Sequence, residues 1–240
     1  LVLSGSYMKT NRGSHNFEVS YDDGELDELQ NRHYTVDRER WGLNAALDYR
    51  LADGGQLLLR GLYNDYSDLE YRRRKRERVG SSRIERELKD RLETQTIASV
   101  SGAGKHFLSG GWGLDYAASV SYAAEDEPEA YYSIFRQSKV AFAPNVTPTS
   151  IDPDDIRANP LNEDFSKFTL NEQSSEDNFT SDRDWTGAVN LTRAFLGDSR
   201  NGLFKLGAKL RSKSKGRDNG TTVFDPDGDF FLADYTDPGF

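Results

Sequence analysis

The chain alternates between apolar and polar side chains over three stretches, and this two-residue period constrains its fold more than any other feature. The clearest stretch, residues 41–66, is two such runs separated by Asp53–Gly55, residues suited to a tight turn. Because successive side chains of a strand point to opposite faces of a sheet, each run predicts a strand with one apolar and one polar face. The apolar positions of the first run are Leu43, Ala45, Leu47, Tyr49 and Leu51.

The same pattern recurs over 112–122 and 185–195, where aromatic residues close the apolar positions. A band of about ten residues that is apolar at alternate positions and bounded by aromatics is typical of a membrane-spanning β-strand. The mean hydropathy of −0.78 is compatible with this interpretation, because only every second residue of such a strand faces lipid. No window of about 18 apolar residues predicts a transmembrane helix.

Composition excludes several other classes of protein. The absence of Cys excludes a disulfide framework and a Cys-based zinc site. A net charge of −9 argues against a general nucleic-acid binder, which would carry a basic surface. Leu1 begins within a strand pattern, without an initiator Met or signal peptide, and no closing strand precedes Phe240. We therefore expect an internal piece of a longer protein.

The alternation predicts seven strands in an up-and-down order. Three connections are short: Asp53–Gly55, Ser109–Gly111 and Gly197–Asn201. At the opposite ends of the strands the predicted connections 22–32, 136–177 and 217 onward are long and charged. Short turns at one end and long loops at the other are typical of an outer-membrane barrel. The predicted strands cover approximately residues 1–21, 33–52, 56–79, 84–108, 112–135, 178–196 and 202–216.

Residues 70–93 allow two interpretations. Ile84, Leu88 and Leu92 are spaced by four, as on a helix face. A hairpin with Ser81 and Ser82 as its turn is favoured instead, because it keeps the up-and-down order and brings opposite charges together. That register pairs Arg78 with Glu85, Glu77 with Arg86, and Arg76 with Glu87.

The predicted connection 136–177 contains four prolines and is too long for a plain hairpin loop. Connections of this length are usually functional or disordered, and this one is expected to fold over the mouth of a barrel. Within it, Asp152–Ala158 is a candidate short helix with Ser150 as its N-cap.

The candidate ligand contacts lie where the chain enters this loop. Aromatic side chains at an extracellular rim can stack on a sugar or an aromatic ligand, although they can equally form an outer aromatic girdle. The sequence contains no nucleophile-elbow motif, and its three His residues lack the spacing of metal ligands. It therefore predicts no enzyme, cofactor or metal site. The ligand-contact candidates are Tyr131, Tyr132, Phe135 and Arg136.

Two further motifs have competing interpretations. The basic run Arg72–Arg76 can bind lipopolysaccharide or a phosphate-bearing ligand, but pairing with the acidic residues of 85–93 is favoured. Asp225, Asp227 and Asp229 alternate as in calcium loops. The residue after Asp229 is Phe230 rather than Gly, so a solvated turn is favoured there.

Four segments together resemble the barrel of TonB-dependent outer-membrane receptors, most closely the branch linked to uptake of carbohydrates and other nutrients. The resemblance covers residues 1–137 and, more weakly, 178–216. It lies in the order of charged and aromatic residues along the strands. The segments are WGLNAALDYRL, LLLRGLYNDYSDLEYRRRKRERV, RIERELKDRLETQTIASVSGAGKHF and EDEPEAYYSIFRQ.

The resemblance implies one segment of an antiparallel transmembrane β-barrel of about 22 strands, located in a Gram-negative outer membrane and plugged by an upstream domain. It implies active uptake of a scarce nutrient such as a siderophore or carbohydrate. The implied partners are the TonB complex, reached through a plug region outside this sequence, outer-membrane lipid with lipopolysaccharide, and the small nutrient ligand. The alternatives are a passive porin, an outer-membrane enzyme, and a soluble all-β binding or adhesion module.

Overall fold

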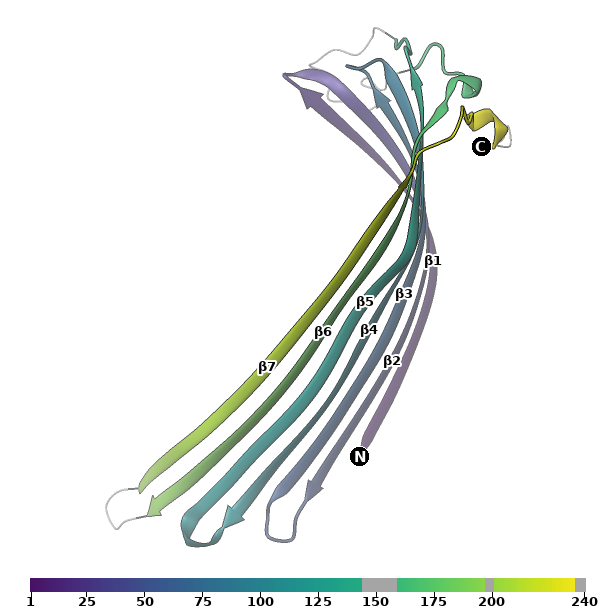
Figure 1. The fold of residues 1–240 in the computed structure, drawn as a ribbon. Coiled ribbons are helices and arrows are strands. Elements are labelled where there is room, and N and C mark those ends of the chain that lie inside the picture. The colour runs from purple at the N-terminus through teal and green to yellow at the C-terminus, as the bar shows by residue number, and fades with distance from the viewer. Residues whose placement is uncertain (144–158, 197–200, 236–240) are drawn as a thin grey trace.

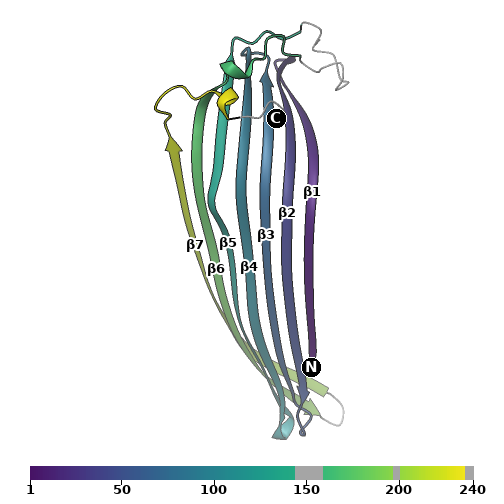
Figure 2. The same ribbon diagram turned by 90° about the vertical axis from the view of Figure 1, so that its right-hand side faces the viewer.

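The computed structural model describes residues 1–143, 159–196 and 201–235, and they form one antiparallel sheet in chain order (Figure 1). This confirms the predicted all-β, up-and-down arrangement. The sheet is open, with the first and seventh strands at its edges (Figure 2). None of the helices described is long and apolar enough to cross a membrane. The strands are β1 (Val2–Asp22), β2 (Glu25–Arg50), β3 (Gln56–Arg78), β4 (Arg83–Leu108), β5 (Trp112–Ser138), β6 (Thr169–Leu196) and β7 (Asn201–Phe224).

Two of the three predicted short turns are confirmed at one end of the sheet, here called the turn end. Asp53 Oδ1 accepts a hydrogen bond of 3.0 Å from the Gly55 backbone N–H, and Gly54 has a φ of 80° that favours glycine. Ser109–Gly111 forms a short turn between β4 and β5, in which Gly110 and Gly111 have φ values of 71° and 77°. The third predicted turn lies almost entirely outside the described residues.

At the opposite end, here called the loop end, the predicted connection 22–32 is wrong. Asp23 and Gly24 alone form the turn, with φ values of 46° and 83°. Two consecutive positive φ angles match the tight hairpin turn that Asp-Gly favours, because its twist fits that of the flanking strands. The charged residues that suggested a loop belong to β2, where Glu28 is buried and ion-paired to Arg76.

Two other predicted boundaries are also wrong. β6 begins at Thr169 rather than 178, so the predicted loop 136–177 shrinks to 139–168, and β7 continues to Phe224 rather than ending at 216. The added segments are polar, and they pair with each other between Gln173–Phe224 and Asn178–Asn219. Cross-strand pairing determines where these strands begin and end, and the hydropathy pattern along one strand carries no information about that pairing. The candidate helix Asp152–Ala158 lies outside the described residues.

Residues 70–93 form the predicted hairpin rather than a helix, but the predicted register is wrong by two residues. The turn has four residues, Val79–Ser82, so Arg76 faces Glu85 and Arg74 faces Glu87. A shift of two keeps every side chain on its expected face. Opposite charges therefore still meet at these positions, although the register also places like charges opposite each other in the pairs Arg78 and Arg83, Lys75 and Arg86, and Arg72 and Lys89.

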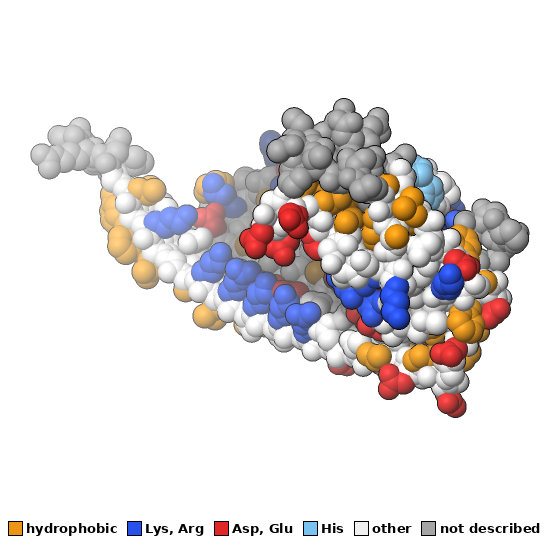
Figure 3. Space-filling model, turned by 90° about the horizontal axis from the view of Figure 1, so that it is seen from above, with side chains coloured by type: hydrophobic (Ala, Val, Ile, Leu, Met, Phe, Trp, Pro, Cys, Tyr) orange, Lys and Arg blue, Asp and Glu red, His pale blue; other side chains and the backbone are white. Residues whose placement is uncertain are grey.

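The sheet has two faces of different chemistry. The apolar face carries Leu43, Tyr63 and Val120 toward the turn end, and the charged face carries Arg76 and Glu85 toward the loop end. Seen from the loop end, a row of Lys and Arg side chains borders a hollow, while hydrophobic side chains lie along the outer margin (Figure 3).

A β-bulge in β5 changes which residues face which side. The pairing with β4 and β6 slips by one between Glu127 and Ala130, and Glu129 adopts a φ of 50°. Pro128 within the bulge has no N–H to donate to a neighbouring strand. Beyond the bulge, even-numbered residues of β5 therefore join the charged face instead of the apolar face.

The buried core lies at the loop end, on the apolar face, beneath residues 139–143, 159–168 and 225–235. One cluster joins Ile84, Val140, Phe168 and Leu232. The Leu232 backbone N–H donates to the Phe168 carbonyl at 2.9 Å, which ties the segment after β7 to the start of β6. A second cluster, around Leu26 and Leu29, lies under Phe142. The loop-end half of the apolar face is therefore partly covered, and the turn-end half is bare.

Candidate functional site

Alternating acidic and basic side chains form an ion-pair ladder on the charged face of β2–β5. Glu85 is its centre and contacts three guanidinium groups, those of Arg136 at 2.8 Å, Arg76 at 3.2 Å and Arg78 at 3.3 Å. Glu28 binds Arg76 from the other side at 2.7 Å. Burial raises the pKa of Glu85, but the hydrogen bond from Arg136 and the nearby arginine charges outweigh it and hold that pKa below its ordinary value.

The basic run divides between the two faces of the sheet. Arg72 and Arg74 both bind Glu87, as the pairing interpretation predicts. Lys75 points the other way and binds Glu163 at 2.8 Å. The ladder is thus largely neutralised within the sheet, and only the apolar-face members of the run lie beside the loops.

The ladder continues toward the middle of the strands. Glu70 binds Lys89 at 3.3 Å and Arg91 at 3.4 Å, and Arg91 also reaches Glu127 at 3.3 Å. Some arginine side chains keep a buried Nε without a hydrogen-bond partner among the described residues. Such a donor is costly unless a hydroxyl, carboxylate or water meets it. These Nε atoms belong to Arg72, Arg74 and Arg91.

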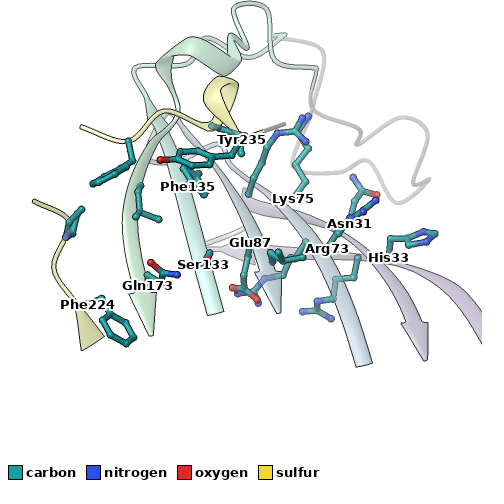
Figure 4. Close-up of a pocket in the computed structure, with 18 of the residues that line it drawn as sticks. Asn31, His33, Arg73, Lys75, Glu87, Ser133, Phe135, Gln173, Phe224 and Tyr235 are labelled. Atoms are coloured by element: carbon teal, nitrogen blue, oxygen red, sulfur yellow. The ribbon is translucent and has the colours of Figure 1, made fainter. Parts of the chain in front are cut away.

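A pocket of about 880 Å³ lies at the loop end of the apolar face (Figure 4). Its two walls differ in chemistry. Phe135, Phe224 and Tyr235 supply aromatic rings, while Arg73 and His33 supply polar groups from β3 and β2. This volume lies in the range of pockets that hold small ligands, and such pockets combine apolar walls with a few polar groups.

Glu163 anchors the loop beside this pocket. Its carboxylate binds Lys75 of β3 and Arg86 of β4, which lie directly opposite each other on the two strands. Burial raises the pKa of Glu163, but the hydrogen bonds from Lys75 and Arg86 outweigh it and lower that pKa overall. Sequence reasoning did not select Glu163. An acidic residue in a long loop carries no signal of its own, because its partners are set by how the loop folds back.

The structure places the four predicted ligand contacts on opposite faces. Tyr131 and Phe135 lie on the apolar face, and of the four only Phe135 lines the pocket. Tyr132 and Arg136 lie on the charged face, where Arg136 belongs to the ladder and the Lys89 ammonium lies 5.7 Å from the Tyr132 ring centre. The four residues therefore do not surround one common site.

The acidic turn after β7 contributes to the pocket instead. Asp225 and Asp227 line it together with Phe230. Among residues 1–143, 159–196 and 201–235, no group of three or more His, Cys, Asp and Glu side chains is arranged to hold a metal ion.

Comparison with known proteins identifies no family. No protein-family model matches the chain, and no curated protein sequence matches it significantly.

Proposed function

We propose that this chain is part of the barrel wall of an outer-membrane transporter of the TonB-dependent class, which takes up a scarce nutrient across a Gram-negative outer membrane. The observation that carries the proposal is a belt of exposed hydrophobic side chains that crosses all seven strands on one face. A soluble protein rarely exposes an apolar patch of this extent. One member from each strand is Leu3, Leu43, Leu59, Val100, Val120, Trp185 and Leu210, each more than half exposed.

The height of the belt supports a membrane environment. On β5 it runs from Trp112 to Tyr122, about 34 Å along a strand. At a strand tilt of about 45° this corresponds to about 24 Å of membrane, close to the apolar band of outer-membrane barrels. Aromatic rings close both ends, where Arg193 stacks on Trp112 at 5.0 Å and Arg183 on Tyr122 at 5.6 Å.

The remaining surfaces fit the parts of such a transporter. The charged face would line the lumen, and the pocket at the loop end would contact the nutrient or lipopolysaccharide at the outer rim. The TonB complex would act through a plug region that this sequence does not contain. Active uptake is thus assigned to the whole protein, with this chain as wall and loops and without an enzymatic role.

The test is the behaviour of the full-length protein extracted from its host's membranes. Heat-modifiable migration on a gel, dependence on detergent and an upstream plug sequence would support the transporter. The same migration without a plug would favour a passive porin. A protein that disperses in buffer without detergent would overturn the proposal and favour a soluble all-β binding module.

A further inference from the structure

The charged face of β7 carries a row of cations. Lys209, Lys213 and Lys215 alternate with Arg211 and Arg217 at every second position, and Lys205 extends the row by four residues. Even-numbered residues of β7 lie on the apolar face with Trp185, so these odd-numbered residues share the charged face. Twelve residues of extended strand span about 40 Å, with neighbouring cations about 7 Å apart.

This row, here called the β7 stripe, differs from the ladder because carboxylates do not balance it. Only Lys213 and Arg211 have partners, Asp182 and Asp184. Within the described residues, the remaining four side chains form no ion pair. The six cations therefore outnumber the two carboxylates that face them from β6, the neighbouring strand within the described residues. The four unpaired members are Lys205, Lys209, Lys215 and Arg217.

The shape of the stripe selects a class of ligand. A compact anion is held by cations that converge on it, whereas these lie in a line along the strand, so a chain with repeated negative charges fits better. The neighbouring charged-face positions of β6 supply hydroxyl and amide groups beside the two paired carboxylates, Asp182 and Asp184, and none is aromatic. A nucleic acid would need aromatic platforms for its bases, so a sugar polymer is favoured. These β6 residues are Thr180, Thr186, Asn190 and Thr192.

We propose that the β7 stripe is a binding track for a linear carbohydrate that carries carboxylates along its length. The row of Lys and Arg beside the hollow in Figure 3 shows the surface that such a chain would follow. The track runs along β7 from the turn end toward the loop end, which is the direction of passage through a barrel. The inference deepens the proposed function and rests on it, because it names the class of nutrient.

The test measures binding of an oligogalacturonate of about eight sugars to the full-length protein in detergent. Its fully methyl-esterified form is the neutral reference. We expect the acid to bind at least about tenfold more tightly than the ester, since several ion pairs of a fraction of a kcal/mol add along the chain. Raising the salt concentration should weaken binding of the acid, because salt screens exposed charges.

A fourfold variant, K205Q/K209Q/K215Q/R217Q, should lose about tenfold in affinity for the acid. The control, K9Q/R12Q/K139Q/K167Q, removes four exposed cations that lie off the stripe and should change affinity less than twofold. Equal binding of acid and ester would overturn the track even if the variant failed to fold. Equal affinity of the variant and the native protein would also overturn it. Binding of an oligothymidylate of the same charge as tightly as the acid would reject the carbohydrate assignment.

Failure of the track is distinguishable from failure of the proposed function. A heat-modifiable, detergent-dependent protein that does not discriminate acid from ester would retain the transporter and lose the track. A protein that discriminates them but needs no detergent would retain the track and lose the transporter.

Discussion

The turn-end and loop-end halves of the same strands are stabilised in different ways. In the turn-end half, one face carries a bare apolar belt around Val120, which is 57% exposed, and stability there depends on what surrounds the sheet. In the loop-end half, Glu85 is only 3% exposed, and ion pairs and folded-back loops supply the contacts from within the chain. One pleat geometry therefore serves two environments, and the side chains alone determine which half needs a partner.

The largest effect is expected from breaking the ladder with Glu85→Gln. The substitution leaves Arg76, Arg78 and Arg136 around a neutral side chain, and removing one partner of a buried ion pair costs about 3–5 kcal/mol. Urea unfolding of the full-length protein measures this loss. Glu18→Gln is the control, since Glu18 is half exposed and forms one ion pair with Arg32, and should cost less than about 1 kcal/mol. Equal losses for the two variants would show that the loop-end half does not depend on its ladder.

A slightly smaller effect is expected in the turn-end half from Val120→Arg. A cation at the middle of a lipid-facing belt costs about 2–4 kcal/mol. Ser121→Arg, one residue away on the charged face, should be close to neutral. Folding of both variants into lipid bilayers measures the difference. Equal stability of the two would remove the distinction between the faces on which the proposed membrane position depends.

The loop anchor allows a prediction about pH. The pKa of Glu163 is lowered in the folded state, so its contribution to stability is present above its unfolded pKa of about 4.5 and is lost as the pH falls through the folded pKa. We expect hydrogen exchange of residues 159–168, corrected for its intrinsic pH dependence, to accelerate below about pH 4.5.

Glu163→Gln should reproduce this release at neutral pH, at a cost of about 2 kcal/mol, because Lys75 and Arg86 lose a charged acceptor. The variant should also show a flatter pH dependence than the native protein. If the corrected hydrogen-exchange rates of residues 159–168 in the native protein are equal at neutral pH and below about pH 4.5, Glu163 does not anchor the loop.

The same contrast explains which parts of the structure the sequence predicts. In the turn-end half, alternation around Leu43 and glycines at Gly54 and Gly110 are local signals, and strands and turns follow from them. In the loop-end half, the boundaries of β2 and β6 depend on partners distant in sequence, such as Arg76 for Glu28. A window of neighbouring residues does not contain those partners, so the local pattern predicts loops where charged strands form.

The candidate ligand contacts failed to converge for a related reason. Tyr131 and Tyr132 are adjacent, so the pleat places them on opposite faces whatever their role. The bulge between Glu127 and Ala130 then exchanges the faces on which even- and odd-numbered residues of β5 lie, relative to the turn-end half of the strand. Pro128 was the available signal, because a proline within a central strand indicates a bulge.

The smallest predicted effect concerns the turn that replaced the predicted loop 22–32. Gly24→Ala should destabilise the protein by about 1 kcal/mol, because Gly24 has a φ of 83°. The added Cβ would meet no atom within 4 Å, so backbone strain alone sets this cost. Gly61→Ala is the matched control, with equal space around it but no positive φ, and should stabilise by a few tenths of a kcal/mol because glycine weakens a strand interior. Opposite signs in urea unfolding would establish the two-residue turn. If both substitutions stabilise, residues 22–32 form the longer, relaxed connection that their charge first suggested, and the loop-end half begins later along β2.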